Sequence, residues 1–161
     1  MNTTAFLAYL DGRQVRWKLV LDRCAKAADQ DPRAQLVAVF DALGEWAHAP
    51  CDGLRSNAFV NAQAVLAEDG GVVRTAAARH KRALRGRLAA LAGEAGAADP
   101  GLLADQLLLI FEGAVLAHAL DSVAEPVEKA RHTACRLIAA ATTRTPGVRG
   151  ATGRGAEGPG F

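Results

Sequence analysis

The sequence predicts an all-α fold, and three observations carry this prediction. Half of the 161 residues are apolar, but only 5% are aromatic, and alanine and leucine dominate. Alanine and leucine favour helices, whereas the β-branched and aromatic residues that favour strands are few. Apolar residues recur every three or four positions over long segments, as amphipathic helices require. Asp-Pro pairs and glycines stand where such helices would begin and end. The length fits one domain with a substantial core.

Two helices are expected in the N-terminal third of the chain. The first should cover residues 3–28, and its apolar face consists of Phe6, Leu10, Trp17, Leu21, Cys24 and Ala28. Asp31 can cap a second helix that has Pro32 in its first turn and continues to about His48. Its inward face consists of Leu36, Val39, Phe40, Leu43, Trp46 and Ala47.

Two further helices are expected in the middle of the chain. A short one should cover residues 54–67 and end at Asp69-Gly70-Gly71, and its shared face consists of Phe59, Ala62, Gln63 and Leu66. A longer one should cover residues 72–95, with Gly96 as its C-terminal cap. Its stripe consists of Val73, Ala77, His80, Leu84, Leu88 and Leu91.

The fifth helix, expected from Pro100 to about residue 121, is apolar on almost every side. Asp105 and Glu112 share one narrow polar strip, and His118 stands alone. Such a helix must be covered on more than one face, and it is too short and too interrupted for a membrane span. A sixth helix should cover residues 125–142, and its stripe consists of Val127, Ala130, Ala134, Leu137, Ile138 and Ala141. Much of this stripe is alanine, and small residues favour close approach of a neighbouring helix. The glycine-rich segment 143–161 is expected to be disordered.

Composition narrows the functional classes. A formal charge of +2 is too small to indicate nucleic-acid binding by bulk electrostatics, and the basic segment 74–87 is best interpreted as a solvated helix face. The N-terminus lacks the pattern of a signal peptide. Three cysteines without framework spacing favour a reduced, cytoplasmic protein.

No motif marks an enzyme, a metal site or a cofactor. Two His-x-x-Cys pairs, His48/Cys51 and His132/Cys135, have zinc-compatible side chains but no second pair at finger-like spacing, so we interpret them as coincidental. His80 lies on an apolar stripe, where a core histidine is the simpler reading than a ligand contact. The aromatic residues either fill the core or line a cavity, and spacing alone leaves both open.

Several blocks occur together in an order that resembles the C-terminal regulatory domain of TetR-family transcriptional repressors. They are FDALGEW at 40–46, FVNA at 59–62, AARHKRALR at 77–85 and DPGLLADQLLLIFEGA at 99–114. The resemblance implies a helical ligand-sensing and dimerisation domain over residues 1–142, whose last two helices pair with those of a second subunit as a four-helix bundle. It also implies an inducer cavity among the preceding helices.

On this basis we expect a homodimer that senses a small, mainly apolar ligand. The expected ligand-binding residues are Trp17, Phe40, Trp46, Phe59, His80, Gln106 and Phe111. The expected dimer-interface residues are Leu109, Leu116, His118, Val127, Ala130, Ala134, Leu137, Ile138 and Ala141. The family's N-terminal helix-turn-helix is absent from this sequence, so DNA binding is expected only through such a segment elsewhere. The alternatives are a helical interaction module with a filled core, and a thiol- or metal-using enzyme with a reactive Cys51.

Overall fold

The computed structural model describes residues 3–49, 53–66 and 71–143, and within these ranges the chain forms six α-helices and no strand. The helices are α1 (Thr3–Ala27), α2 (Pro32–Ala47), α3 (Leu54–Leu66), α4 (Val72–Glu94), α5 (Pro100–Ala119) and α6 (Pro126–Thr142). The all-α prediction is confirmed, with helix ends within two residues of those expected. Cys51, the predicted turn at Asp69-Gly70 and all but the first residue of the segment 143–161 lie outside the described residues.

The predicted helix ends have the expected local chemistry. The Asp31 carboxylate accepts a hydrogen bond from Arg33 N at 3.0 Å, and the Asp99 carboxylate accepts one from Leu102 N at 2.9 Å. Both caps are followed by proline at the first helical turn. Gly96 has a φ of 78°, a left-handed conformation that glycine adopts without the penalty of a Cβ. These residues therefore fix where three of the helices begin or end.

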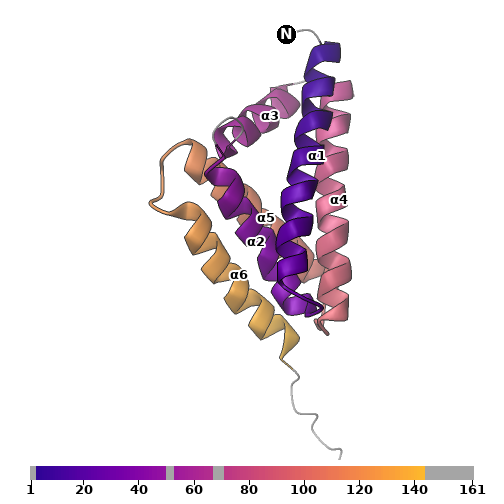
Figure 1. The fold of residues 1–161 in the computed structure, drawn as a ribbon, viewed down its shortest axis with the longest axis vertical. Helices are drawn as coiled ribbons and strands as arrows, with labels where there is room; N and C mark the ends of the chain where they lie inside the picture. Colours follow the sequence, from indigo (N-terminus) through magenta and orange to yellow (C-terminus); the bar gives the residue numbers. More distant parts are fainter. Residues whose placement is uncertain (1–2, 50–52, 67–70, 144–161) are drawn as a thin grey trace, which may run out of the picture.

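The helices are arranged around α2 and α5 (Figure 1). The long helices α1 and α4 lie side by side along one edge, α3 crosses one end, and α6 forms the opposite edge against α2 and α5. The core between them contains the most deeply buried side chains, which are Leu36, Val39, Phe40, Leu43, Leu54, Leu88, Leu103, Leu107 and Val115. A second, smaller cluster joins α1, α3 and α4, and its buried members are Phe6, Leu10, Val60 and Ala76.

Helix α5 runs through the middle of the protein. By length and composition it is the one helix of the described residues that could cross a membrane. However, Leu103, Leu107 and Val115 are fully buried against other helices, and the Asp105 carboxylate forms an ion pair with Arg85 on α4 at 2.6 Å. The inward side of this apolar helix is therefore covered by its neighbours.

The alanine stripe of α6 faces its own protomer, which corrects part of the predicted dimer interface. Ala130, Ala134 and Ile138 are at most 7% exposed in the single chain. They belong to the main core, where α6 packs on α2 and α5. Because these side chains are already covered, they present no surface to a second subunit. Alanine permits close helix packing on either side of a helix, so the stripe by itself did not reveal which partner it meets.

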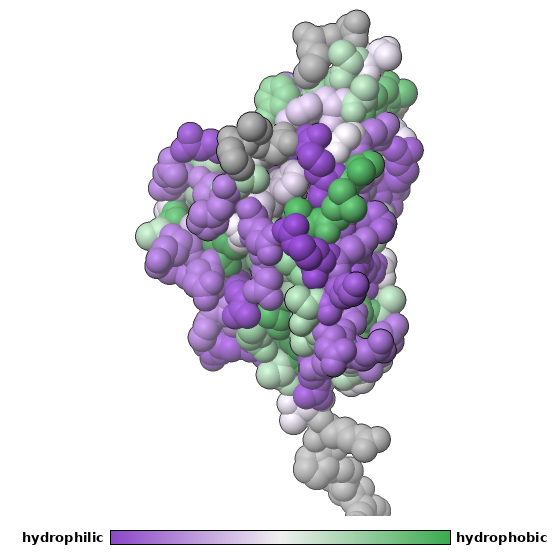
Figure 2. All heavy atoms as spheres, in the orientation of Figure 1, coloured by the Kyte–Doolittle hydropathy of each residue, from purple (hydrophilic) through white to green (hydrophobic). Residues whose placement is uncertain are grey.

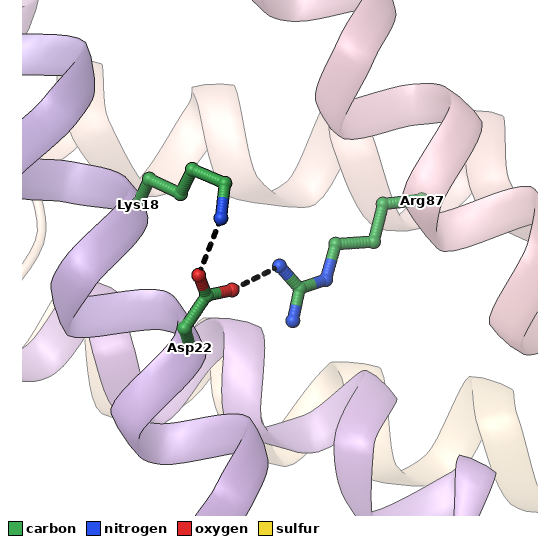
Figure 3. A network of polar contacts seen from close by, with 3 residues as sticks. All are labelled: Lys18, Asp22 and Arg87. Carbon is green, nitrogen blue, oxygen red and sulfur yellow. Dashed lines mark hydrogen bonds and ion pairs between the residues drawn. The ribbon is translucent and has the colours of Figure 1, made fainter.

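A charged cluster fastens α1 to α4 (Figure 3). The Asp22 carboxylate on α1 lies 2.6 Å from Lys18 Nζ one turn earlier and accepts a hydrogen bond from Arg87 Nη1 on α4 at 2.8 Å. The hydrogen bond from Lys18 and that from Arg87 hold the pKa of Asp22 below its usual value. The cluster is partly exposed, so its contribution to stability is at most about 1 kcal/mol.

Candidate ligand-binding site

A cavity of about 70 Å³ lies between α1, α3, α4 and α5. A single water needs about 10–15 Å³ measured in this way, so the space exceeds what one or two waters occupy. It is smaller than the pockets of about 300 Å³ and more that enclose drug-sized ligands. The side chains that line it are Leu10, Arg13, Gln14, Trp17, Asn57, Val60, Asn61, Ala77, His80, Lys81, Leu84 and Phe111.

One wall of the cavity is aromatic. The rings of Trp17 on α1 and Phe111 on α5 meet edge to face, with centroids 5.6 Å apart. Behind them, Trp46 packs on Trp17 at 6.0 Å and Phe40 packs on Phe111 at 6.4 Å, both from α2. Edge-to-face contacts of this kind are favourable, and they join the wall to the main core.

A buried guanidinium lies beside the aromatic wall. Arg13 is only 5% exposed, although arginine is rarely buried so completely. Its Nη2 donates a hydrogen bond to Asn57 Oδ1 on α3, and its Nη1 donates to Tyr9 Oη at 3.4 Å. The guanidinium carbon also lies 5.4 Å from the ring centroid of Trp46. Arg13 therefore links α1 to both α2 and α3 at the edge of the cavity.

A second polar group comes from α3, α4 and α5. Lys81 Nζ lies 2.5 Å from Glu112 Oε1, so this otherwise buried oxygen is paired with a cation. Asn61 Nδ2 donates a hydrogen bond to Glu112 Oε2 at 3.1 Å. Lys81 Nζ also lies 6.0 Å from the ring centroid of Phe111. Glu112 thus neutralises much of the charge that Lys81 brings to the cavity.

His80 completes the polar lining. Its side chain is 15% exposed, and its Nε2 lies 4.0 Å from Asp11 Oδ1. Burial lowers the pKa of His80, and the neighbouring Arg79 lowers it further, while Asp11 acts in the opposite direction. At neutral pH the imidazole is therefore uncharged and can both donate and accept a hydrogen bond.

The structure brings together three of the seven predicted ligand-binding residues. Trp17, His80 and Phe111 line the cavity. Phe40 and Trp46 are buried behind its aromatic wall, at 1% and 4% exposure, and do not line it. The remaining two, Phe59 and Gln106, do not line this cavity either. Phe59 is 46% exposed and packs on Phe6, and Gln106 is half-buried but absent from the lining.

Apart from His80, the polar lining was missed by sequence reasoning. Its members are Arg13, Gln14, Asn57, Asn61 and Lys81. A signal was nonetheless present for the first two, because they lie between Leu10 and Trp17 at helical spacing on the predicted buried face. A charged residue within a buried stripe needs a partner inside the protein, and it therefore marks a polar site.

Helix α5 also presents an outward row of leucines. Leu102, Leu109 and Leu116 are 53%, 72% and 54% exposed, and their spacing of seven residues places them on one side of the helix. Two of them belong to the predicted dimer interface. Of the other residues in that prediction, His118, Val127, Leu137 and Ala141 are half-buried. The space-filling view shows that apolar patches interrupt the polar surface (Figure 2).

The cysteines and histidines form no cluster in the described parts of the chain. There, no three His, Cys, Asp or Glu side chains are placed to hold a metal ion. His132 is exposed and Cys135 half-buried on α6. Burial and a hydrogen bond to Glu45 raise the pKa of the Cys24 thiol to about 11, which leaves it a protonated, unreactive group at neutral pH.

The fold resembles that of a known regulator. No model of a protein family matches the sequence, and no curated protein matches it. Among solved structures, a TetR-family transcriptional regulator from Streptomyces coelicolor is similar, with a TM-score of 0.67 and 23% sequence identity. The similarity covers 84% of this chain and 68% of that chain. The chain therefore has a TetR-like helical fold.

Proposed function

We propose that this chain is the ligand-binding and dimerisation part of a TetR-like transcriptional regulator and has no enzymatic activity. The observation that carries the proposal is the cavity between α1, α3, α4 and α5, with its aromatic wall, its buried guanidinium and its half-buried polar side chains. Concave sites of this composition are typical of small-molecule binding. The structural similarity to a transcriptional regulator, which covers most of this chain, supports a regulatory role for ligand binding at the cavity.

A ligand in the cavity could change how the surrounding helices are arranged. Its lining comes from four helices, so a bound molecule contacts α1, α3, α4 and α5 at once. A ligand that fits one arrangement of these helices better than another shifts the population toward that arrangement. In this proposal α1 transmits the shift, because Arg13 and Trp17 connect the cavity to the rest of that helix.

A homodimer is the second part of the proposal. The exposed row on α5 supplies an apolar surface that a second copy would cover, and the outer face of α6 borders it. Symmetric association through one surface is the commonest arrangement of soluble oligomers. DNA binding is assigned to a helix-turn-helix segment outside this sequence, and the regulator would act in the cytoplasm.

The competing hypothesis is a helical interaction module with a filled core. It differs from the proposal in one measurable property, the response to ligands. A thermal-shift screen of the purified chain with several hundred small molecules of varied charge tests this difference. The proposal expects reproducible, saturable stabilisation by a small subset of them, because ligands that bind only the folded state raise its stability. A flat response across the screen would favour the filled-core module.

The oligomeric state is tested separately by sedimentation equilibrium over a range of protein concentrations. The proposal expects a dimer at micromolar concentration. A well-folded monomer at all concentrations would contradict the dimer, and would leave the ligand hypothesis to the thermal-shift screen.

A further inference from the structure

We propose that the cavity selects small molecules that carry a carboxylate on an apolar body. This inference rests on the proposed ligand-binding function and adds the chemical class of the ligand. It replaces the expectation of a mainly apolar ligand, because half of the cavity lining is polar. Two cationic side chains, Arg13 and Lys81, are among the twelve residues that line the space, and none of the twelve is acidic.

Arg13 is the group best placed to bind a carboxylate. A guanidinium presents several donors in a rigid, planar fork that matches the two oxygens of a carboxylate. At 5% exposure the group is shielded from water, so an ionic hydrogen bond to it is stronger than at the surface. The hydrogen bonds to Asn57 and Tyr9 fix its position before a ligand arrives, which reduces the entropy lost on binding.

The other polar groups extend the donor set. Asn57 lines the cavity, and its amide oxygen accepts the hydrogen bond from Arg13. The donor group of the same side chain is its NH2 group. Lys81 adds a positive charge, but its ion pair with Glu112 offsets much of it. Lys81 therefore has a secondary role, and neutral His80 and Gln14 contribute hydrogen bonds without charge.

The apolar wall accounts for the rest of the ligand. Trp17, Phe111 and Leu84 face a space too small for a drug-sized molecule, so the apolar body is a short alkyl chain or a single ring. A ligand amine would face the Arg13 guanidinium and is disfavoured by like charge. A neutral amide of the same shape would lose the ionic part of the contact with Arg13.

Three matched sets of probes test this inference on the intact chain. The first contains butyrate and benzoate, the second butyramide and benzamide, and the third butylamine and benzylamine. Titration calorimetry and thermal shift are measured for each probe at low and at high NaCl. We expect the carboxylates to bind about tenfold or more tightly than their amides, since charge-assisted hydrogen bonds are about twice as strong as neutral ones. Their affinity should fall with added salt, and the amines should not bind.

Variants then locate the interaction. Arg13→Lys keeps the positive charge but removes the forked donors of the guanidinium, so carboxylate affinity should fall about tenfold. Arg13→Gln removes both the charge and the forked donors, so affinity should fall further. Lys81→Gln should weaken binding by less. Arg82→Gln is the matched control: it removes the same charge from an exposed position on α4 and should leave affinity within about twofold. Circular dichroism verifies that each variant is folded. If Arg13→Gln is unfolded, the single variants Arg13→Lys and Lys81→Gln still test the inference.

Two results would overturn the inference, and they differ from failure of the proposed function. If amides or amines bind as tightly as carboxylates, or if Arg82→Gln weakens carboxylate binding as much as Arg13→Lys, the cavity binds ligands but does not select carboxylates. If only neutral compounds from a broader screen bind, the ligand function stands and the carboxylate inference is wrong. If no compound of any charge binds, both are wrong.

Discussion

Substituting Leu109 with serine should weaken dimerisation and leave the protomer intact. Leu109 is 72% exposed in the single chain, so its side chain contributes little to the protomer's own core. Fully burying a leucine stabilises by about 2 kcal/mol, so covering this exposed fraction in a dimer contributes about 1.5 kcal/mol per chain. A symmetric dimer contains the side chain twice. The loss of about 3 kcal/mol corresponds to an increase of about a hundredfold in the dimer dissociation constant.

Sedimentation equilibrium of the wild type and of Leu109→Ser measures this constant directly. Leu19→Ser is the matched control, because Leu19 is 65% exposed but lies on α1, outside the row of leucines on α5. The control should dimerise as the wild type does. The reasoning is refuted if Leu109→Ser leaves the dissociation constant unchanged, or if Leu19→Ser raises it equally. Thermal melts of the two variants, measured at a concentration where both are monomeric, should coincide, since neither substitution is in the core.

Three further predictions concern the protomer. Gly44 lies inside α2, and a Cβ added there would be 3.9 Å from the nearest side chain, so Gly44→Ala should raise the free energy of unfolding by about 0.5–1 kcal/mol in a denaturant melt. Gly96 has a φ of 78°, which is unfavourable for alanine, so Gly96→Ala should lower the free energy of unfolding. The pKa of Asp22 is lowered in the folded protein, so the stabilisation that its carboxylate provides is present above the unfolded pKa of 3.8 and is lost as the pH falls through the lower folded pKa. The unfolding free energies of the wild type and of Asp22→Asn should therefore converge between about pH 5 and pH 2. A constant difference over this range would contradict the argument. Cys24, with a pKa of about 11, should react with iodoacetamide at pH 8 more slowly than Cys135 on peptide mass mapping, and faster labelling of Cys24 would contradict the burial argument.

The candidate site divides into a part that periodicity could reveal and a part that it could not. Trp17 and His80 were predicted because each stands on an apolar stripe, and Phe111 because it belongs to a helix that is apolar on almost every side. Asn57, Asn61 and Lys81 were missed because similar polar side chains occur on the solvated faces of most helices. Only the packing of α3 and α4 on α5 places these three half-buried side chains at the cavity.

Local sequence signals determined the helices themselves. The spacing of apolar residues, the caps at Asp31 and Asp99 and the left-handed Gly96 depend on contacts within a few residues, which the sequence contains in full. For the same reason α5 could be identified as a helix that needs cover on more than one face. These features act over one or two helical turns, so the all-α fold was predictable without knowledge of how the helices meet.

The tertiary structure alone decided which surface each helix face meets. Ala134 is fully buried against its own protomer, whereas Leu109 faces outward, although both stand among apolar neighbours in the sequence. Phe59 is partly exposed, and Arg13 is buried beside Trp46. Burial of a side chain depends on contacts with residues far away along the chain, and a pattern of three or four residues does not contain them. The cavity is a product of those distant contacts, which is why Asn57, Asn61 and Lys81 emerged only from the fold.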